Sequence, residues 1–251
     1  MQRKLKFSVV MACVIAAAIS FHIFGGPAIA QTLDIGSMYK PPLSNEKGTG
    51  MIDLIIKEVF SRIGIKVEII LVASTHALAK ANKGLYDGDI MRVGGASRNY
   101  PNLIQVPETI YDFDFVAFSK NLNIPLTDWE GLKPYRVAVP AGWVETDNHV
   151  TEENTKTLVR LGSPFKLFNT LKKNKTDLII YERLMGYELI KELGLSDIHV
   201  LEPPLSSKKM YLYLHKKHKD LVPRAAEATR AMKQDGTFQK IVDKTLSNYS
   251  K

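Results

Sequence analysis

The sequence predicts an α/β protein of two lobes, each a mainly parallel sheet flanked by helices, joined by two crossover segments. Strand and helix patterns alternate near the start of the chain, alternate again from Tyr135 onward, and are separated by a long extended stretch. Strands that alternate with helices form parallel sheets with right-handed crossovers. Ligands bind such sheets beyond the carboxyl ends of the strands, so two facing lobes predict a cleft that closes about a hinge.

Residues 1–30 are predicted to be a cleavable secretory signal. Three basic residues precede an apolar run over residues 7–24, and a small-x-small site ends at Ala30. This order predicts cleavage after Ala30, with Gln31 as the mature N-terminus, and export to the periplasm. The alternative is a membrane anchor, because the run approaches spanning length, but Ser20 and His22 interrupt it.

Composition limits the chemistry of the exported chain. The single cysteine lies within the signal, and about 220 residues can bury a core without disulfides. The formal net charge of +8 falls to +5 when the three basic residues of the signal are removed. The remaining lysines are scattered without interleaved aromatic residues, which favours solvated faces over nucleic-acid binding.

The first alternating unit predicts a β-α-β-α-β order. Apolar residues recur at helical spacing from Ile52 to Ile63, with Thr49 as the candidate cap and Gly64 as the stop. A second helix is expected from Ser74 to about Lys83. The strands of this unit are expected over residues 33–38, 65–72 and 89–93.

The rest of the chain predicts a crossover, a second alternating unit and a helical C-terminus. Ser163-Pro164 opens a helix in the cap-then-proline order, and another helix is expected from Glu182 to Leu193. Gly236 separates two C-terminal helices, with Thr237 as candidate cap of the second. Extended segments are expected over residues 103–118, 135–139, 177–181, 198–201 and 209–215.

These elements assign residues 31–112 and 212–251 to lobe 1 and residues 113–211 to lobe 2. The hinge is expected in the segments near residues 108–118 and 205–213.

Short motifs then resemble, in order along the chain, those of a known family. They are Tyr39-Lys40-Pro41-Pro42, Gly48 to Leu54, Gly84-Leu85-Tyr86-Asp87, Val106 to Tyr111, Val137 to Gly142, Asp177 to Glu182 and Asp235-Gly236-Thr237-Phe238. The chain resembles a type II periplasmic solute-binding protein of family 3, which includes the polar amino-acid receptors of ABC transporters. The resemblance implies a monomer that closes on a small, carboxylate-bearing, amino acid-like solute for an ABC-type permease, without metal or cofactor.

Two arginines are candidates to hold the ligand carboxylate. The resembled receptors follow their third strand with a Thr-x-x-Arg segment, and the stretch from Gly88 here lacks that threonine. An arginine donates two parallel hydrogen bonds to a carboxylate. Arg92 is slightly favoured because it lies at the carboxyl end of a strand, and Arg98 matches the family's arginine by spacing. The alternative for each is a surface ion pair with an acid such as Asp87 or Asp89.

Five further residues complete the candidate ligand-binding set. An acid at the position of Glu182 accepts from the ligand ammonium in the resembled receptors, and the alternative is an acid that stabilises a helix N-terminus by up to ~1 kcal/mol. Tyr39, Tyr111 and Trp143 are candidate aromatic walls, with core packing as the alternative. His76, near the start of the second helix, is a candidate donor or a structural histidine.

We expect a binding protein and not an enzyme, because the sequence shows no catalytic constellation. Residues 31–251 contain no cysteine, and their histidines lack metal-ligand spacing. The G-x-S-x-G and phosphate-loop patterns are absent. Two alternatives use the same fold: a cyclohexadienyl dehydratase-like enzyme with Glu182 as general acid, and a receptor that presents its closed form to a membrane sensor.

Overall fold

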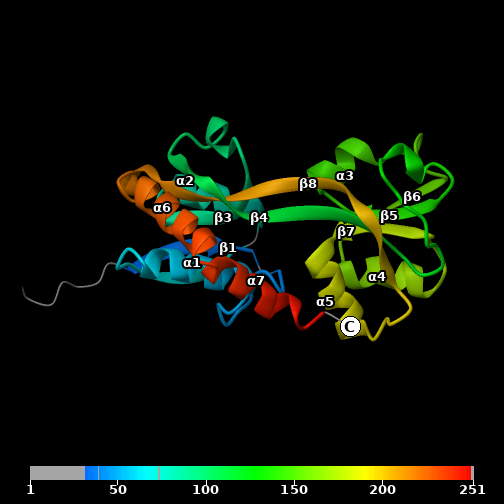
Figure 1. The fold of residues 1–251 in the computed structure, drawn as a ribbon. Coiled ribbons are helices and arrows are strands. Elements are labelled where there is room, and N and C mark those ends of the chain that lie inside the picture. Colours follow the sequence, from blue (N-terminus) through cyan, green and yellow to red (C-terminus); the bar gives the residue numbers. More distant parts are fainter. Residues whose placement is uncertain (1–31, 39, 73, 250–251) are drawn as a thin grey trace, which may run out of the picture.

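The computed structural model describes residues 32–38, 40–72 and 74–249, so the predicted signal lies outside the described residues. Figure 1 shows two lobes bridged by two long strands. The elements in chain order are β1 (Thr32–Ser37), α1 (Met51–Ser61), β2 (Lys66–Leu71), α2 (Ser74–Asn82), β3 (Gly88–Val93), η1 (Ala96–Arg98), β4 (Leu103–Ser119), η2 (Glu130–Leu132), β5 (Arg136–Pro140), α3 (Val144–His149), β6 (Thr157–Leu161), α4 (Pro164–Lys172), β7 (Leu178–Glu182), α5 (Arg183–Leu193), β8 (His199–His215), η3 (Lys216–His218), α6 (Leu221–Gln234) and α7 (Thr237–Leu246).

The strands form one eight-stranded sheet in the order β2-β1-β3-β8-β4-β7-β5-β6. In lobe 1, β1 pairs in parallel with β2 and β3, and in lobe 2, β5 pairs in parallel with β6 and β7. The antiparallel pair β4–β8 runs through both lobes, with register shifts along its length. The predicted α/β fold of two mainly parallel half-sheets joined by two crossovers is therefore confirmed. The predicted lobe boundaries near residues 112 and 212 fall inside these two strands and stay predictions.

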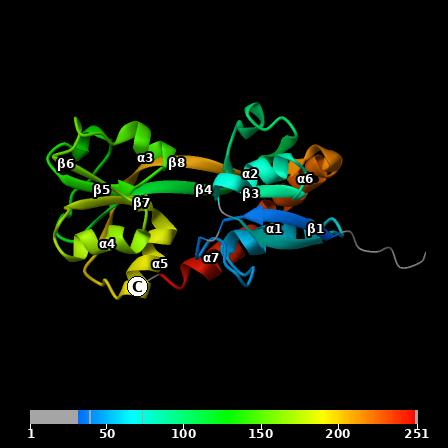
Figure 2. The ribbon, with the colours of Figure 1, turned by 180° about the vertical axis from the view of Figure 1, so that it is seen from behind.

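Helices cover both faces of each half-sheet (Figures 1 and 2). In lobe 1, α1, α6 and α7 pack together, while α2 contacts β1, β3 and β8. In lobe 2, α4 and α5 pack against each other and against β7. The helical spacing of α1 is confirmed, because Ile52, Ile55, Ile56, Val59 and Phe60 are fully buried. Among the described residues, no helix is both long enough and apolar enough to cross a membrane.

The start of α1 differs from the prediction, because Gly50 and not Thr49 is its N-cap. The Asp53 carboxylate accepts from the Gly50 N–H at 3.0 Å, and the Thr49 hydroxyl instead bonds with Asn45 at 3.2 Å. A Cβ at Gly50 would lie 2.4 Å from the carbonyl oxygen of Leu43. The close backbone approach therefore selects glycine at the cap.

Three further details correct the sequence prediction. Gly236, in a left-handed conformation with φ of 78°, is the N-cap of α7 in place of Thr237. The expected extended segments 198–201 and 209–215 belong to the single strand β8. The elements α3 and β6 were not predicted, because α3 is short and β6 is an edge strand with no fully buried residue. The predicted cap Ser163 is confirmed, since its side chain accepts from the N–H of Lys166.

Candidate ligand-binding cleft

A cavity of about 520 Å³ lies between the lobes, at the carboxyl ends of β1, β3 and β5. This is where the topology of two facing parallel half-sheets places a ligand site. Its walls come from both lobes and from the two crossover strands. The lining residues are Met38, Lys40, Met91, Arg92, Val93, Phe113, Phe115, Trp143, Val144, Glu145, Lys208 and Met210.

Arg92 reaches this cavity through a bulge near the end of β3. The register between β3 and β8 shifts between Asp89 and Arg92, and Met91 within the bulge has a φ of 58°. Bulges of this kind redirect side chains beside binding sites. Sequence reasoning favoured Arg92 over Arg98, and Arg92 lines the cavity while Arg98 does not.

Asp89 holds the Arg92 guanidinium from behind. The Asp89 side chain is fully buried, and its Oδ1 lies 2.5 Å from Arg92 Nε while its Oδ2 lies 3.4 Å from Nη2. Burial raises the pKa of Asp89, although the neighbouring Arg92 acts in the opposite direction. The remaining terminal nitrogen, Nη1, has the Met38 sulfur as its neighbour at 3.8 Å. The ion pair named as the alternative therefore forms, but inside the protein and beside the cavity.

Lys40 crosses the cleft from lobe 1 to lobe 2. Its ammonium lies 4.9 Å from the centre of the Trp143 ring, which is a cation–π contact. Burial lowers the pKa of Lys40, Glu182 raises it and Arg92 lowers it further. Sequence reasoning missed this residue, although it stands in the quoted Tyr39-Lys40-Pro41-Pro42 motif.

Aromatic rings form one wall of the cavity. Trp143 stacks on Tyr181, with ring centres 4.9 Å apart and planes at 20°, and meets the edges of Phe113 and Phe115 at 5.7 and 5.9 Å. The structure thus places Trp143 in the predicted wall. Phe113 and Phe115 were missed, although their spacing of two on β4 puts both side chains on the same face.

Glu182 lies behind this wall and not in it. It ends β7, caps α5 and is fully buried. Its Oε2 accepts from the Met185 N–H at 2.7 Å, and its Oε1 accepts from the Tyr111 hydroxyl at 2.5 Å. Burial raises the pKa of Glu182 to about 7, against the lowering effect of these hydrogen bonds. Neither Glu182 nor Tyr111 lines the cavity, and the helix-terminus interpretation of Glu182 accounts for its contacts.

A second ion pair borders the cavity on the side of lobe 2. Glu145, at the start of α3, has its Oε2 3.1 Å from the Lys208 ammonium, and its Oε1 accepts from the Ser206 hydroxyl at 2.7 Å. Lys208 and Ser206 belong to the crossover strand β8. The sequence carried no signal for this pair, because its partners lie about sixty residues apart and meet only through the fold.

Two further candidate residues, His76 and Arg98, are not brought to the cavity. His76 is an exposed residue of α2, and Arg98 is an exposed residue of the short 3-10 helix η1. Neither side chain is among those that line the cleft. Tyr39 lies outside the described residues.

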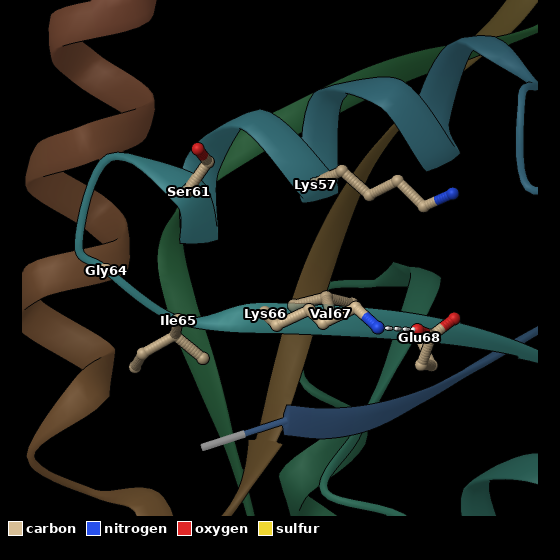
Figure 3. A pocket seen from close by; sticks show the side chains of 7 residues that line it. All are labelled: Lys57, Ser61, Gly64, Ile65, Lys66, Val67 and Glu68. Carbon is tan, nitrogen blue, oxygen red and sulfur yellow. Dashed lines mark ion pairs between the residues drawn. The ribbon is translucent and has the colours of Figure 1, made fainter. Parts of the chain in front are cut away.

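Hollows also lie elsewhere on the molecule. Figure 3 shows one of about 550 Å³ between the end of α1, with Lys57 and Ser61, and the start of β2. The ion pair there, Lys66 with Glu68 at 2.7 Å, is exposed at 65% and 49%. This hollow lies at the amino end of β2, opposite the ligand-binding ends of the strands. Within the described part of the chain, no cluster of histidine and acidic side chains could hold a metal.

Comparisons with known proteins agree with this architecture. No protein-family model matches the chain. An uncharacterized protein of Shewanella oneidensis is 24% identical over 205 residues, which cover 78% of this chain and 76% of that protein. Among solved structures, a probable amino-acid ABC transporter extracellular-binding protein of Bacillus subtilis has a TM-score of 0.73 at 19% identity, and the match covers 86% of this chain and 98% of that one.

Two further solved structures are similar over most of their length. A histidine kinase sensor domain with similarity to periplasmic binding proteins has a TM-score of 0.69 at 17% identity, covering 86% of this chain and 96% of that one. The GluR0 ligand-binding core of Nostoc punctiforme, in complex with L-glutamate, has a TM-score of 0.66 at 15% identity, covering 84% and 98%. These likenesses, with two parallel half-sheets bridged by β4 and β8, show that the chain has the two-lobed fold of the type II periplasmic binding proteins.

Proposed function

We propose that this protein is a periplasmic solute-binding protein that captures a small carboxylate-bearing solute between its lobes, for delivery to an ABC-type permease. The observation that carries the proposal is Arg92. Its guanidinium is held by the buried Asp89, its side chain is 12% exposed, and it lines the cavity between the lobes. An arginine held in this way is organised in advance to donate to a carboxylate, so little side-chain entropy is lost on binding.

Closure of the lobes by a hinge in β4 and β8 is the second part of the proposal. The cavity walls divide between the lobes, with Lys40 and Arg92 on one side and Trp143 on the other. Val93 and Val144 line the cavity from opposite lobes and are exposed at 49% and 72%. Approach of the lobes would remove this apolar surface from water, which favours closure.

The enzyme alternative, with Glu182 as general acid, receives no support from the contacts of that residue. Its pKa of about 7 would suit proton transfer. However, Glu182 is fully buried, and its two oxygens accept from Tyr111 and Met185. A general acid must come within hydrogen-bond distance of the substrate, and this carboxyl group has no exposed surface to do so.

Delivery to a permease and presentation to a sensor remain compatible with the same closed state. The similar structures include both an ABC transporter extracellular-binding protein and a histidine kinase sensor domain. Transport is our proposal, as the sequence motifs resemble the transport receptors. A test is whether the protein, loaded with ligand, stimulates ATP hydrolysis by a permease complex from the same organism in proteoliposomes.

The ligand-binding test is a thermal-shift screen of residues 31–251 against amino acids, organic acids, amines and short peptides. A ligand at 100-fold excess over its Kd stabilises the folded state by ~2.7 kcal/mol, which raises the midpoint measurably. We expect at least one carboxylate-bearing compound to do so. A panel in which only amines, or no compound at all, raise the midpoint would contradict the proposal.

A further inference from the structure

The charges of the cleft do not match the zwitterion of an amino acid. Three cationic side chains line the cavity, Lys40, Arg92 and Lys208, against one acidic side chain, Glu145. Arg92 is balanced by Asp89 behind it, and Lys208 by Glu145. Within the part of the chain that the structure describes, the Lys40 ammonium faces the Trp143 ring and forms no ion pair, although Glu182 raises its pKa from beyond ion-pair distance. The lining therefore carries an excess of positive charge.

The cleft donors without an oxygen acceptor indicate that the ligand is an anion. The Asp89 carboxylate occupies Nε and Nη2 of Arg92, and the partner of Nη1 among the described residues is the Met38 thioether, a weak acceptor. The Lys40 ammonium likewise has an aromatic face in place of an oxygen acceptor. Among the described residues, neither Lys40 Nζ nor Arg92 Nη1 therefore has an oxygen acceptor. A carboxylate would complete both at once through charge-assisted hydrogen bonds.

Three carboxylates in or near the cleft, in contrast, already accept from protein donors. Glu182 accepts from Tyr111 and Met185, Asp89 from Arg92, and Glu145 from Lys208 and Ser206. A ligand ammonium would lose its hydration without gaining an acceptor oxygen, which is unfavourable. It would also lie in the field of Lys40 and Arg92, which have the same sign of charge.

The rest of the lining is apolar. Phe113, Phe115 and Trp143 supply aromatic faces and edges, and Met38 and Met210 supply flexible thioethers. Such walls favour a hydrocarbon or aromatic body over a polar one. On the basis of the proposed function, we propose that the natural ligand is an organic acid with an apolar or aromatic body and no ammonium group. Its carboxylate binds to Lys40 Nζ and Arg92 Nη1.

The test compares ligands that differ only in the amino group. Isothermal titration of residues 31–251 would use 3-phenylpropionate against L-phenylalanine, 4-methylpentanoate against L-leucine, and glutarate against L-glutamate. We expect the deaminated acid to bind at least about tenfold more tightly within the pairs that bind. An amino acid that binds as tightly as its deaminated partner overturns this inference and leaves the proposed function standing. Absence of binding by every carboxylate tested overturns both.

Variants of Lys40 test the proposed ammonium contact with the acid that binds most tightly. Lys40→Met keeps the length and apolar character of the side chain but removes its charge, and we expect it to weaken binding of the acid by about tenfold or more. Lys40→Arg, which keeps the charge, should retain most of the affinity.

The matched control is Lys209→Met, on an exposed lysine of the same chain segment as Lys208, and we expect it to change affinity less than about twofold. Circular dichroism and the melting midpoint without ligand would check that each variant is folded. Equal affinity in Lys40→Met and the unmodified protein overturns the assignment.

Discussion

Individual side chains in and beside the cleft depend on buried acidic partners. Asp89 is fully buried and directs the Arg92 guanidinium toward the cavity, while Glu182 is fully buried and links the hydroxyl of Tyr111 to the start of α5. Breaking a buried charge pair from one side leaves an uncompensated charge, which costs about 3–5 kcal/mol. Conservative substitutions therefore show the role of these groups in binding more clearly than substitution by alanine, which also leaves a buried charge without a partner.

Arg92→Lys should weaken ligand binding by about ten- to hundredfold, because lysine keeps the charge but loses the planar fork that serves Asp89 and the ligand together. Arg98→Lys is the matched control, since Arg98 is exposed and does not line the cavity. Isothermal titration with the ligand found in the screen measures both. If Arg98→Lys lost more affinity for the ligand than Arg92→Lys, the wrong arginine would have been assigned to the ligand carboxylate.

The raised pKa of Glu182 predicts how stability depends on pH. Between the ordinary glutamate pKa of 4.5 and the folded value of about 7, the folded state binds more protons at this group than the unfolded state does. The stabilisation that this group contributes is therefore fully present below about pH 4.5 and is lost as pH rises through 7, a change on the order of 3 kcal/mol. Glu182→Gln, which mimics the protonated form, should remove this part of the pH dependence.

Urea unfolding at pH 5 and pH 8 measures the free energy of unfolding of the unmodified protein and of Glu182→Gln, and so the part of the pH dependence that Glu182 contributes. We expect the variant to be the more stable of the two at pH 8. Glu153→Gln, on an exposed acid, is the control and should follow the unmodified protein. Parallel pH profiles for all three proteins would refute the assignment.

At the scale of elements, α5 connects the site to the core of lobe 2. Glu182 caps its first turn, and Gly194, in a left-handed conformation with φ of 62°, ends it. Between them, Gly186 allows the helix to approach β4, because a Cβ there would lie 2.0 Å from the Phe118 ring. Phe118 in turn packs edge-on against Phe168 at 5.3 Å. The helix is thus held against the sheet at the position that orients Glu182.

Gly186→Ala should destabilise the protein by ~1–3 kcal/mol, because the steric conflict with Phe118 outweighs the gain of ~1 kcal/mol in helix propensity. Adding Phe118→Leu should recover part of this loss by making room for the methyl group. Gly162→Ala is the control, since a Cβ there would have no atom within 4 Å, and it should change stability by less than ~0.5 kcal/mol. The free energy of unfolding, measured by urea denaturation, tests this prediction. A Gly186→Ala protein as stable as the control would contradict the proposed steric conflict with Phe118.

At the scale of the whole molecule, side-chain contacts join the lobes besides the crossover strands. Lys40 contacts Trp143 across the cleft, and Tyr249, just beyond α7 of lobe 1, packs on α5 of lobe 2. The Tyr249 ring stacks on Tyr187 at 6.2 Å, and its hydroxyl bonds with Glu188. Contacts made in one arrangement of the lobes stabilise that arrangement relative to any other.

Tyr249→Ala should therefore shift the lobes away from the arrangement described here. An aromatic stack is worth about 1 kcal/mol, which corresponds to about a fivefold change in the equilibrium. Because residues 31–251 contain no cysteine, Lys83→Cys and Lys173→Cys provide specific label sites, one on each lobe, for single-molecule distance measurements. Lys244→Ala, on an exposed residue of α7, is the control. A distance distribution unchanged by Tyr249→Ala would show that this contact does not bias the lobes.

The local pattern of the chain was enough to determine most of its elements and their order. The buried face of α1, the cap at Ser163 and the carboxyl-end position of Arg92 all follow from periodicity and spacing within about a dozen residues. The tertiary structure decided which side chains meet in the cleft. Lys40 faces Trp143 across about a hundred residues of sequence, and Glu182 is fully buried with its oxygens on Tyr111 and Met185. No local pattern encodes these contacts, because charge balance and burial depend on partners that only the folded chain brings together.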